Sequence, residues 1–298
     1  MRNFLINIAR MMLPNGRMKK KLRAMRRPNA EKLNRRAIDA VSGAVWGAAD
    51  KTIREAAKNQ GAENRNARLL MKKSALLAGG DTMEMPDGAR FWLPQFGWDF
   101  IQTHLGDTER FYEQDVLDGL RRFIPKGAVI LDIGANIGNH SIFWARDGAS
   151  RIHAFEPVPR TFAHLVRNIG LNDLGEIIIP HNIGLGDAKS AGAIAQYSSG
   201  NIGGTHIAAG AGGLKIEALD GLDLGEKKID FVKIDVEGFE LKTLAGAKKT
   251  LERHRPAVFI EAFEETADQV AAFFAQLGYG EPKEYKNWNW LFLPDRDR

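Results

Sequence analysis

From residue 128 onward, apolar segments of strand length alternate with amphipathic segments of helix length. Four of the five apolar segments are followed by a segment with helical periodicity. The five apolar segments occupy residues 128–133, 151–156, 176–183, 230–235 and 257–262. Parallel strands need such crossover connections, so the pattern predicts an α/β fold with a doubly wound sheet and helices on both faces. Residues 281–294 carry strand patterning without a crossover helix. We therefore predict a mostly parallel sheet that ends in an antiparallel pair.

A Gly- and Ser-rich stretch at residues 184–215 interrupts this alternation. It replaces the helix expected after the third strand. Long loops within compact domains are often functional, and this one leaves the sheet at its carboxyl edge, where open α/β sheets bind ligands. We expect a long loop at the mouth of a substrate pocket.

The N-terminal part of the chain differs from the rest. Helical periodicity covers residues 29–59, and a second helix is expected to end at Gly79. Residues 82–93 read as a hairpin around a Pro-Asp-Gly turn, and residues 109–124 as an amphipathic helix. We predict a basic arm with a helical extension over residues 1–80, followed by an α/β domain over residues 81–298.

Charge is distributed unevenly along the chain. Residues 1–36 carry 12 Lys or Arg and one acidic residue, so this segment has a formal charge of +11 against −6 for the rest. Together with the apolar side chains near its start, the arm is suited to lie on an anionic membrane. A solvated tail is the alternative. No small-residue cleavage site follows the opening, and the chain has no cysteine. We expect a cytoplasmic protein in peripheral contact with the inner face of the membrane.

The sequence VILDIGANIGNHS, residues 129–141, connects the first strand to a helix through a glycine turn. Gly134 and Gly138 let the backbone approach a ligand, and the helix that follows directs free N–H groups toward it. A P-loop requires a lysine where Asn139 stands, and the dinucleotide motif requires a glycine where Asn136 stands. S-adenosylmethionine has no phosphate and needs neither. The turn therefore favours S-adenosylmethionine as the cofactor.

Two acidic residues follow the first two strands. Glu156 lies 22 residues after Gly134, where a carboxylate can accept both ribose hydroxyls. An acid at this place also serves NAD, so Glu156 alone leaves that alternative open. Asp132 closes the first strand and would orient the turn or meet the ammonium of the cofactor through water.

The residues for chemistry are expected at the ends of later strands. Methyl transfer to an alcohol requires an aligned nucleophile and is helped by a base. The candidates for this base are Asp235, Glu237 and His206, with Glu261 and His140 as further options. The acids at 235, 237 and 261 could instead hold Mg²⁺, and Glu237 could simply cap a helix. We predict no metal.

The segments VILDIGANIGNHS, HAFEPVP, FVKIDVEGFELKTLAGA and PAVFIEAF, in this order, resemble the FkbM family of methyltransferases. FYE at residues 111–113 and NWLFLP near the end are similar as well, so the resemblance extends over residues 82–294. It implies a Rossmann-like class I methyltransferase fold, S-adenosylmethionine as the cofactor, and O-methylation of a sugar or a polyketide-like natural product.

The resemblance also implies a role for individual residues. It assigns Glu156 to the ribose, Asp235 to the edge of the methyl-transfer site, and Glu113 to closing over the cofactor. The methionine end of the cofactor is assigned to Gly134, Ala135, Asn136 and Gly138, and the adenine to the segment that contains Asn182, Gly184 and Leu185.

Two other classes of function stay open. An RNA methyltransferase would use the basic arm as its electrostatic footprint, although the rest of the chain is acidic and shows no base-stacking motif. A non-catalytic cofactor-binding scaffold at the membrane would not need the acids of the crevice. We expect a small-molecule or glycan hydroxyl as acceptor, and we do not expect nucleic acid.

Overall fold

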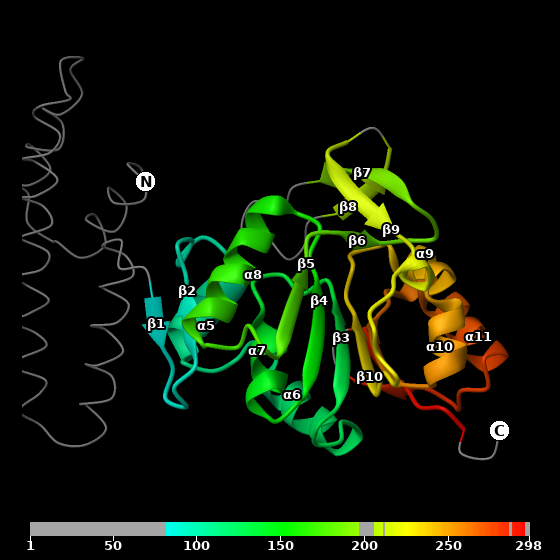
Figure 1. Ribbon diagram of the computed structural model, residues 1–298, viewed down its shortest axis with the longest axis horizontal. Coiled ribbons are helices and arrows are strands. Elements are labelled where there is room, and N and C mark those ends of the chain that lie inside the picture. Colours follow the sequence, from blue (N-terminus) through cyan, green and yellow to red (C-terminus); the bar gives the residue numbers. More distant parts are fainter. Residues whose placement is uncertain (1–81, 197–205, 211, 286–287, 296–298) are drawn as a thin grey trace, which may run out of the picture. The chain divides into compact units, whose positions relative to one another are not determined.

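The structure is a computed structural model that describes residues 82–196, 206–210, 212–285 and 288–295 (Figure 1). The basic arm and the helical extension predicted for residues 1–80 lie outside the described residues, so those expectations stay predictions. None of the described helices is both long enough and apolar enough to cross a bilayer.

A seven-stranded sheet with the order β12-β13-β11-β10-β3-β4-β5 forms the centre of the described chain. Five strands run parallel, and β13 pairs antiparallel with both β11 and β12. The strands are β3 (Val129–Ile133), β4 (Arg151–Phe155), β5 (Ile178–His181), β10 (Phe231–Ile234), β11 (Ala257–Glu261), β12 (Lys283–Glu284) and β13 (Asn289–Phe292). This arrangement confirms the predicted α/β fold and its antiparallel terminal strand.

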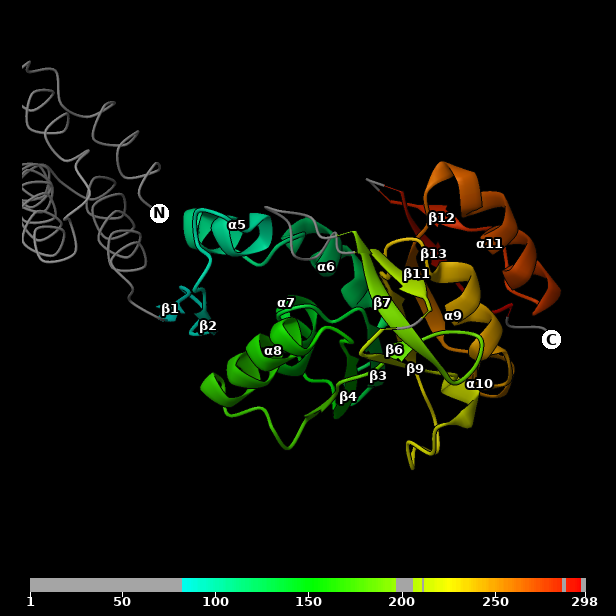
Figure 2. The same ribbon diagram turned by 90° about the horizontal axis from the view of Figure 1, so that it is seen from above.

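Helices cover both faces of the sheet, as Figures 1 and 2 show. One face carries α7 (Asn139–Arg146) and α8 (Pro159–Leu171), and the other carries α9 (Glu240–Gly246), α10 (Lys248–His254) and α11 (Glu264–Gln276). Successive strand residues point to opposite faces, so Ile130 joins the core beneath α7 and α8, whereas Leu131 joins the core beneath α9 to α11. The helical segment that follows β10, residues 240–254, is divided into α9 and α10 at Ala247.

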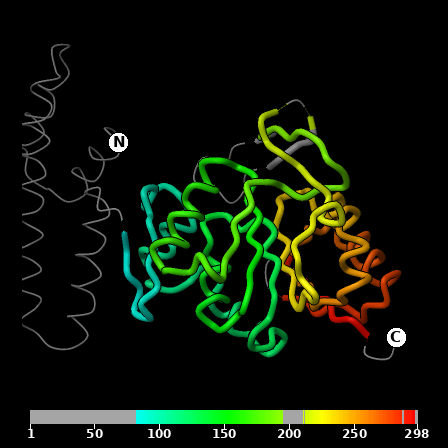
Figure 3. The backbone as a smooth tube through the Cα atoms, in the orientation of Figure 1, coloured from blue at the N-terminus to red at the C-terminus, as the bar shows by residue number. Residues whose placement is uncertain are grey.

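The expectation of a long loop at residues 184–215 is wrong. The described residues of this stretch, with those just after it, form a four-stranded sheet with the order β6-β9-β7-β8, which lies above the carboxyl end of β5 in Figures 1 and 3. Its strands are β6 (Gly184–Leu185), β7 (Ser190–Gln196), β8 (His206–Ala209) and β9 (Leu214–Glu217). A Cβ on Gly212 would lie 2.2 Å from the Gly192 carbonyl oxygen, so this glycine permits close backbone packing. The longest of these strands, β7, is rich in Ala and Gly and has few of the bulky side chains that usually mark a strand.

The segment before β3 consists of a hairpin and short helices, and its buried residues share a core with β3 and α7. The predicted hairpin is confirmed as β1 (Thr82–Glu84) and β2 (Arg90–Trp92), and it is followed by α5 (Phe100–Thr108), α6 (Gln114–Leu120) and the short 3₁₀ helix η1 (Arg121–Phe123). The helix expected from residue 109 starts only at Gln114. Glu109 and Glu113 have positive φ angles of 54° and 58°, which interrupt a right-handed helix.

Candidate active site

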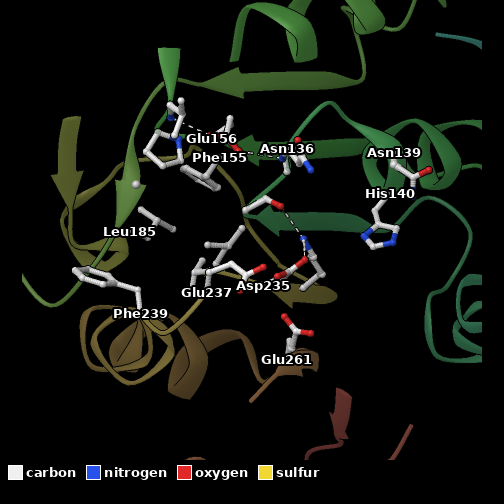
Figure 4. A pocket seen from close by; sticks show the side chains of 18 of the residues that line it. Asn136, Asn139, His140, Phe155, Glu156, Leu185, Asp235, Glu237, Phe239 and Glu261 are labelled. Atoms are coloured by element: carbon white, nitrogen blue, oxygen red, sulfur yellow. Dashed lines mark hydrogen bonds and ion pairs between the residues drawn. The ribbon is translucent and has the colours of Figure 1, made fainter. Parts of the chain in front are cut away.

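A pocket opens at the carboxyl ends of β3, β4, β10 and β11 (Figure 4). It surrounds about 1260 Å³ of empty space, its open mouth included. Its place is the switch point of the sheet, where β3 and β10 are neighbours but the chain continues from them in opposite directions. Nine of the predicted site residues line it: Glu113, Gly134, Ala135, Asn136, Glu156, Gly184, Leu185, Asp235 and Glu237.

The glycine turn after β3 packs directly on the end of β10. Gly134 has a φ of +81°, and a Cβ there would lie 1.8 Å from the carbonyl oxygen of Asp235. Only glycine fits this approach. Gly138, with a φ of +91°, does not line the pocket; a Cβ there would lie 2.8 Å from Leu165 Cδ1. Gly138 therefore brings α7 close to α8, and any effect on a ligand is indirect.

Glu156 joins the glycine turn to the end of β4. Its carboxylate accepts hydrogen bonds from the backbone N–H groups of Asn136 (3.1 Å) and Val158 (2.9 Å). Burial raises the pKa of Glu156 to about 7, against these two hydrogen bonds. A carboxylate has about four acceptor positions, so two stay available for ribose hydroxyls. The Asn136 Oδ1 atom is buried without a partner in the described structure, a second polar atom available to a ligand on the pocket wall.

The far end of the pocket is narrow and apolar. Leu185, Ile216 and Phe239 line it, and a Cβ on Gly184 would lie 2.8 Å from Ile216 Cδ1. Asn182 lies just outside the lining, where its Nδ2 donates to the carbonyl oxygens of residues 156 and 157. This end suits a flat apolar ring such as adenine, with Asn182 supporting the backbone around it.

Behind the glycine turn lies a buried ion network that the sequence analysis did not predict. Lys233 is opposite Asp132 in the register of β10 and β3, so both side chains point toward α7. The Lys233 ammonium is 3.4 Å from Asp132 Oδ1 and 3.2 Å from Asp235 Oδ2, and it donates to the Gly134 carbonyl at 2.7 Å. Burial alone would lower the pKa of Lys233, but the two carboxylates outweigh it and raise the pKa. The ammonium is thus a fixed positive charge that orients Asp235.

Asp132 serves this network from within the protein. It is fully buried, does not line the pocket, and accepts a hydrogen bond from Ser141 Oγ at 2.5 Å. Of the two roles expected for Asp132, this position supports orienting the turn. A lysine within an otherwise apolar strand, FVKI, was the sequence signal that could have revealed the network.

Three carboxyl groups meet at the ends of β10 and β11. Oxygen atoms of Asp235, Glu237 and Glu261 lie within 4.8 Å of one another, and Figure 4 shows them directed toward the same space. Burial and the neighbouring Asp235 raise the pKa of Glu261 to about 9. Burial alone would raise the pKa of Asp235, but Lys233 outweighs it and lowers the pKa. At neutral pH the pair therefore holds one proton, on Glu261. The same oxygens could surround a divalent cation, the alternative named above.

The opposite wall comes from the segment between α5 and α6. Asn139 fixes it by accepting from the Tyr112 backbone N–H (2.9 Å) and donating to the Tyr112 carbonyl (3.0 Å). Glu113 Oε2 lies 3.4 Å from His140 Nε2, an ion-pair distance without hydrogen-bond geometry. The His140 ring lines the pocket and packs on Trp144. The backbone of residue 206 belongs to β8, whereas the side chain of the predicted base His206 lies outside the described structure.

These contacts describe where the predicted residues lie; their roles stay predictions. Several of the pocket residues that the sequence analysis missed are aromatic, and one belongs to the ion network. They include Phe100, Tyr112, Phe155, Lys233 and Phe239. Apart from the lysine, nothing in the local sequence distinguishes them from core residues.

Comparisons with known proteins identify the family of the chain. The sequence model of the Methyltransferase FkbM domain matches residues 132–280, half of the chain. Hexuronic acid methyltransferase AglP of Haloferax volcanii is 34% identical over 145 residues, which cover 47% of this chain and 58% of AglP. Methyltransferase sdnD of Sordaria araneosa is 26% identical over 205 residues, or 55% of this chain and 78% of sdnD.

More distant similarities are of the same kind. An arginine N(omega)-methyltransferase of Streptomyces achromogenes subsp. streptozoticus is 34% identical over 121 residues, or 39% of this chain and 31% of that protein. The crystal structure of methyltransferase FkbM from Methylobacillus flagellatus KT aligns with a TM-score of 0.42 at 16% identity, over 76% of this chain and 58% of that one. On the match to its domain model, the chain belongs to the FkbM methyltransferase family.

Proposed function

We propose that the protein transfers a methyl group from S-adenosylmethionine to a hydroxyl group of a sugar or a natural product. One observation carries the proposal: a single pocket joins the glycine turn and Glu156 to the carboxyl pair of Asp235 and Glu261. The first set suits a nucleoside cofactor without phosphate, and the second suits proton transfer. The printed name of AglP, a hexuronic acid methyltransferase, supports a sugar as acceptor.

The residues of the pocket fit this cofactor. Among the described lining residues, Lys233 is the only Lys or Arg, and its ammonium is held by two carboxylates and a carbonyl. No lysine or arginine of this lining is therefore available for a phosphate. Glu156 would accept the ribose hydroxyls, and the narrow end near Leu185 and Phe239 would hold the adenine. S-adenosylmethionine would supply an activated methyl group.

The protein's own chemical contribution is then alignment and proton transfer. An acceptor hydroxyl would lie against Asp235, and this carboxylate would take the hydroxyl proton as the new C–O bond forms. Lys233 keeps Asp235 ionised and in place, while Glu261 stays protonated and hydrogen-bonded to it. A weak base would suffice because the cofactor would supply a methyl group that is already activated.

Binding and turnover test the two halves separately. By calorimetry, the wild type should bind S-adenosylhomocysteine far more tightly than NAD, and Glu156→Ala should lose about 1–3 kcal/mol of binding free energy. Glu252→Ala, at a half-exposed position on α10, is the control and should bind like wild type. Unchanged affinity in Glu156→Ala would refute the ribose assignment.

For turnover, Asp235→Asn removes basicity and keeps shape. Single-turnover methyl transfer at saturating cofactor should slow about 10²–10⁴-fold. Near-normal turnover would remove Asp235 from the chemistry. Loss of activity in His206→Ala alone would make His206 the base, and loss with EDTA that Mg²⁺ restores would make the acids a metal site. Cofactor binding without turnover on any acceptor would favour the scaffold alternative, and salt-dependent retention of RNA would favour the RNA methyltransferase.

A further inference from the structure

We propose that the acceptor is a hydroxylated ring without a carboxylate that lies against Phe100 and Tyr112, in contrast to the hexuronic acid that the name of AglP indicates for that protein. The inference rests on the proposed function and narrows its substrate class. Two independent features carry it: an aromatic wall at the pocket mouth and the carboxyl groups that line the pocket.

The aromatic wall starts at Phe100, the first residue of α5. Its side chain lines the pocket, although 54% of the residue is exposed. The Phe100 ring meets the Tyr112 ring edge-to-face, with centroids 5.7 Å apart and planes at 82°. Tyr112 in turn packs on His104 at 5.6 Å, and Asn139 holds its backbone by two hydrogen bonds. The exposed Phe100 ring therefore packs on Tyr112, whose own position is fixed by these contacts.

A supported aromatic ring at a pocket mouth is suited to the apolar face of a sugar or polyketide ring. Ligand sites combine such apolar walls with a few polar groups that fix orientation. Here the polar groups come from the opposite wall, at the ends of β10, β11 and the start of β13. Asp235, Glu261 and Asn289 line that wall. A ring seated on Phe100 would thus turn its hydroxyl groups toward groups that form hydrogen bonds with them.

The charge of the pocket decides between neutral and acidic rings. Four carboxyl groups line this half, those of Glu113, Asp235, Glu237 and Glu261. Lys233 is the only Lys or Arg of the described lining; it is 4% exposed and contacts two of the protein's own carboxylates. An acceptor carboxylate would find no free guanidinium or ammonium group on the described wall.

The carboxyl groups on this side of the pocket already lie close together. Oxygen atoms of Asp235, Glu237 and Glu261 are within 4.8 Å of one another. A substrate carboxylate would add a further negative charge beside them. Hydroxyl groups donate hydrogen bonds to these carboxylates without adding charge.

Three matched probes test the charge selection on the full-length protein saturated with S-adenosylhomocysteine. They are methyl β-glucopyranoside, its 6-carboxylate (the methyl glucuronide) and its 2-amino analogue, each titrated by ligand-observed NMR at pH 7. The neutral glycoside should bind at least about 100-fold more tightly than the glucuronide, because juxtaposed like charges cost several kcal/mol. Glu237→Gln should reduce the ratio of the glycoside affinity to the glucuronide affinity about tenfold, because it removes one negative charge from the pocket. Equal or tighter binding of the glucuronide would overturn the proposal, and so would weaker binding of the amino analogue than of the neutral glycoside, because its ammonium group should be attracted by the same carboxylates.

Variants of Phe100 test the aromatic wall. Phe100→Leu should weaken glycoside binding about tenfold, and Phe100→Trp should retain it, since an aromatic face is what the sugar contacts. Trp98→Leu is the matched control, because Trp98 is 58% exposed but does not line the described pocket. Unchanged glycoside affinity in Phe100→Leu would overturn the proposed contact between the acceptor ring and Phe100.

The affinity for S-adenosylhomocysteine distinguishes a failure of the acceptor inference from a failure of the proposed function. If it binds and no glycoside does, the acceptor inference fails while the cofactor assignment stands. If S-adenosylhomocysteine itself does not bind, the proposed function fails and the inference fails with it.

Discussion

Replacing Lys233 with methionine tests the buried ion network. The Lys233 side chain is 4% exposed, and its ammonium lies 3.4 Å from Asp132 and 3.2 Å from Asp235. Methionine keeps the length of the stem and removes the charge. The Asp235 side chain is 37% exposed, so water can hydrate its carboxylate once the ammonium is gone. The cost of an unpaired charge therefore falls on Asp132, which is fully buried.

A buried carboxylate that loses its only nearby cation destabilises a fold by about 3–5 kcal/mol. We expect Lys233→Met to lower the free energy of unfolding by about that amount at pH 7. In the wild type the pKa of Lys233 is raised above its ordinary value, so its contribution is fully present below that ordinary value and constant from pH 4 to pH 8.

Urea unfolding followed by tryptophan fluorescence at several pH values measures this deficit. Lys228→Met is the control: Lys228 also pairs with an aspartate, Asp230 at 2.6 Å, but its side chain is 70% exposed. The Asp230 side chain is only 12% exposed, but an ion pair whose cation lies in solvent contributes about 1 kcal/mol, less than a fully buried pair. The double variant Asp132→Asn/Lys233→Met should recover much of the loss. If Lys233→Met lowers the free energy of unfolding no more than Lys228→Met does, the reasoning is refuted.

Three further predictions concern the turn, the cofactor and the arm. Gly134→Ala should lower the free energy of unfolding by more than about 2 kcal/mol, because its Cβ would clash with the Asp235 carbonyl oxygen. Gly127→Ala, with a φ of +75° but nothing within 4 Å of the new Cβ, should show only the smaller cost of its backbone conformation, and equal losses in urea unfolding would refute the clash at Gly134. Affinity for S-adenosylhomocysteine should rise as the pH passes through about 7, because burial raises the pKa of Glu156 to about 7 and the ionised form accepts ribose hydroxyls; calorimetry of Glu156→Gln should lose this dependence. Deleting residues 1–36 should leave the fold intact by circular dichroism and abolish co-sedimentation with anionic liposomes at low salt; full-length protein that ignores such liposomes would contradict the membrane contact.

The fold was predictable where local patterns carry it. Apolar strands separated by amphipathic helices specify a parallel sheet, and the antiparallel end followed from the missing crossover at residues 281–294. The prediction was wrong at residues 184–215, where Gly- and Ala-rich strands gain their stability from close backbone pairing. Side-chain hydrophobicity, the signal used, is weak in such strands.

Of the site, the sequence alone determined the glycine turn, the acid after the second strand and the acids after the fourth and fifth. These lie at strand ends, and the carboxyl ends of parallel strands share one edge. Only the tertiary structure decided that Lys233 stands opposite Asp132, that Phe100 and Tyr112 form the wall of the pocket, and that Glu261 rather than Asp235 holds the proton. Strand register, the packing of distant segments and the loss of water around a charge arise between residues far apart in the chain, and no local pattern of residues encodes them.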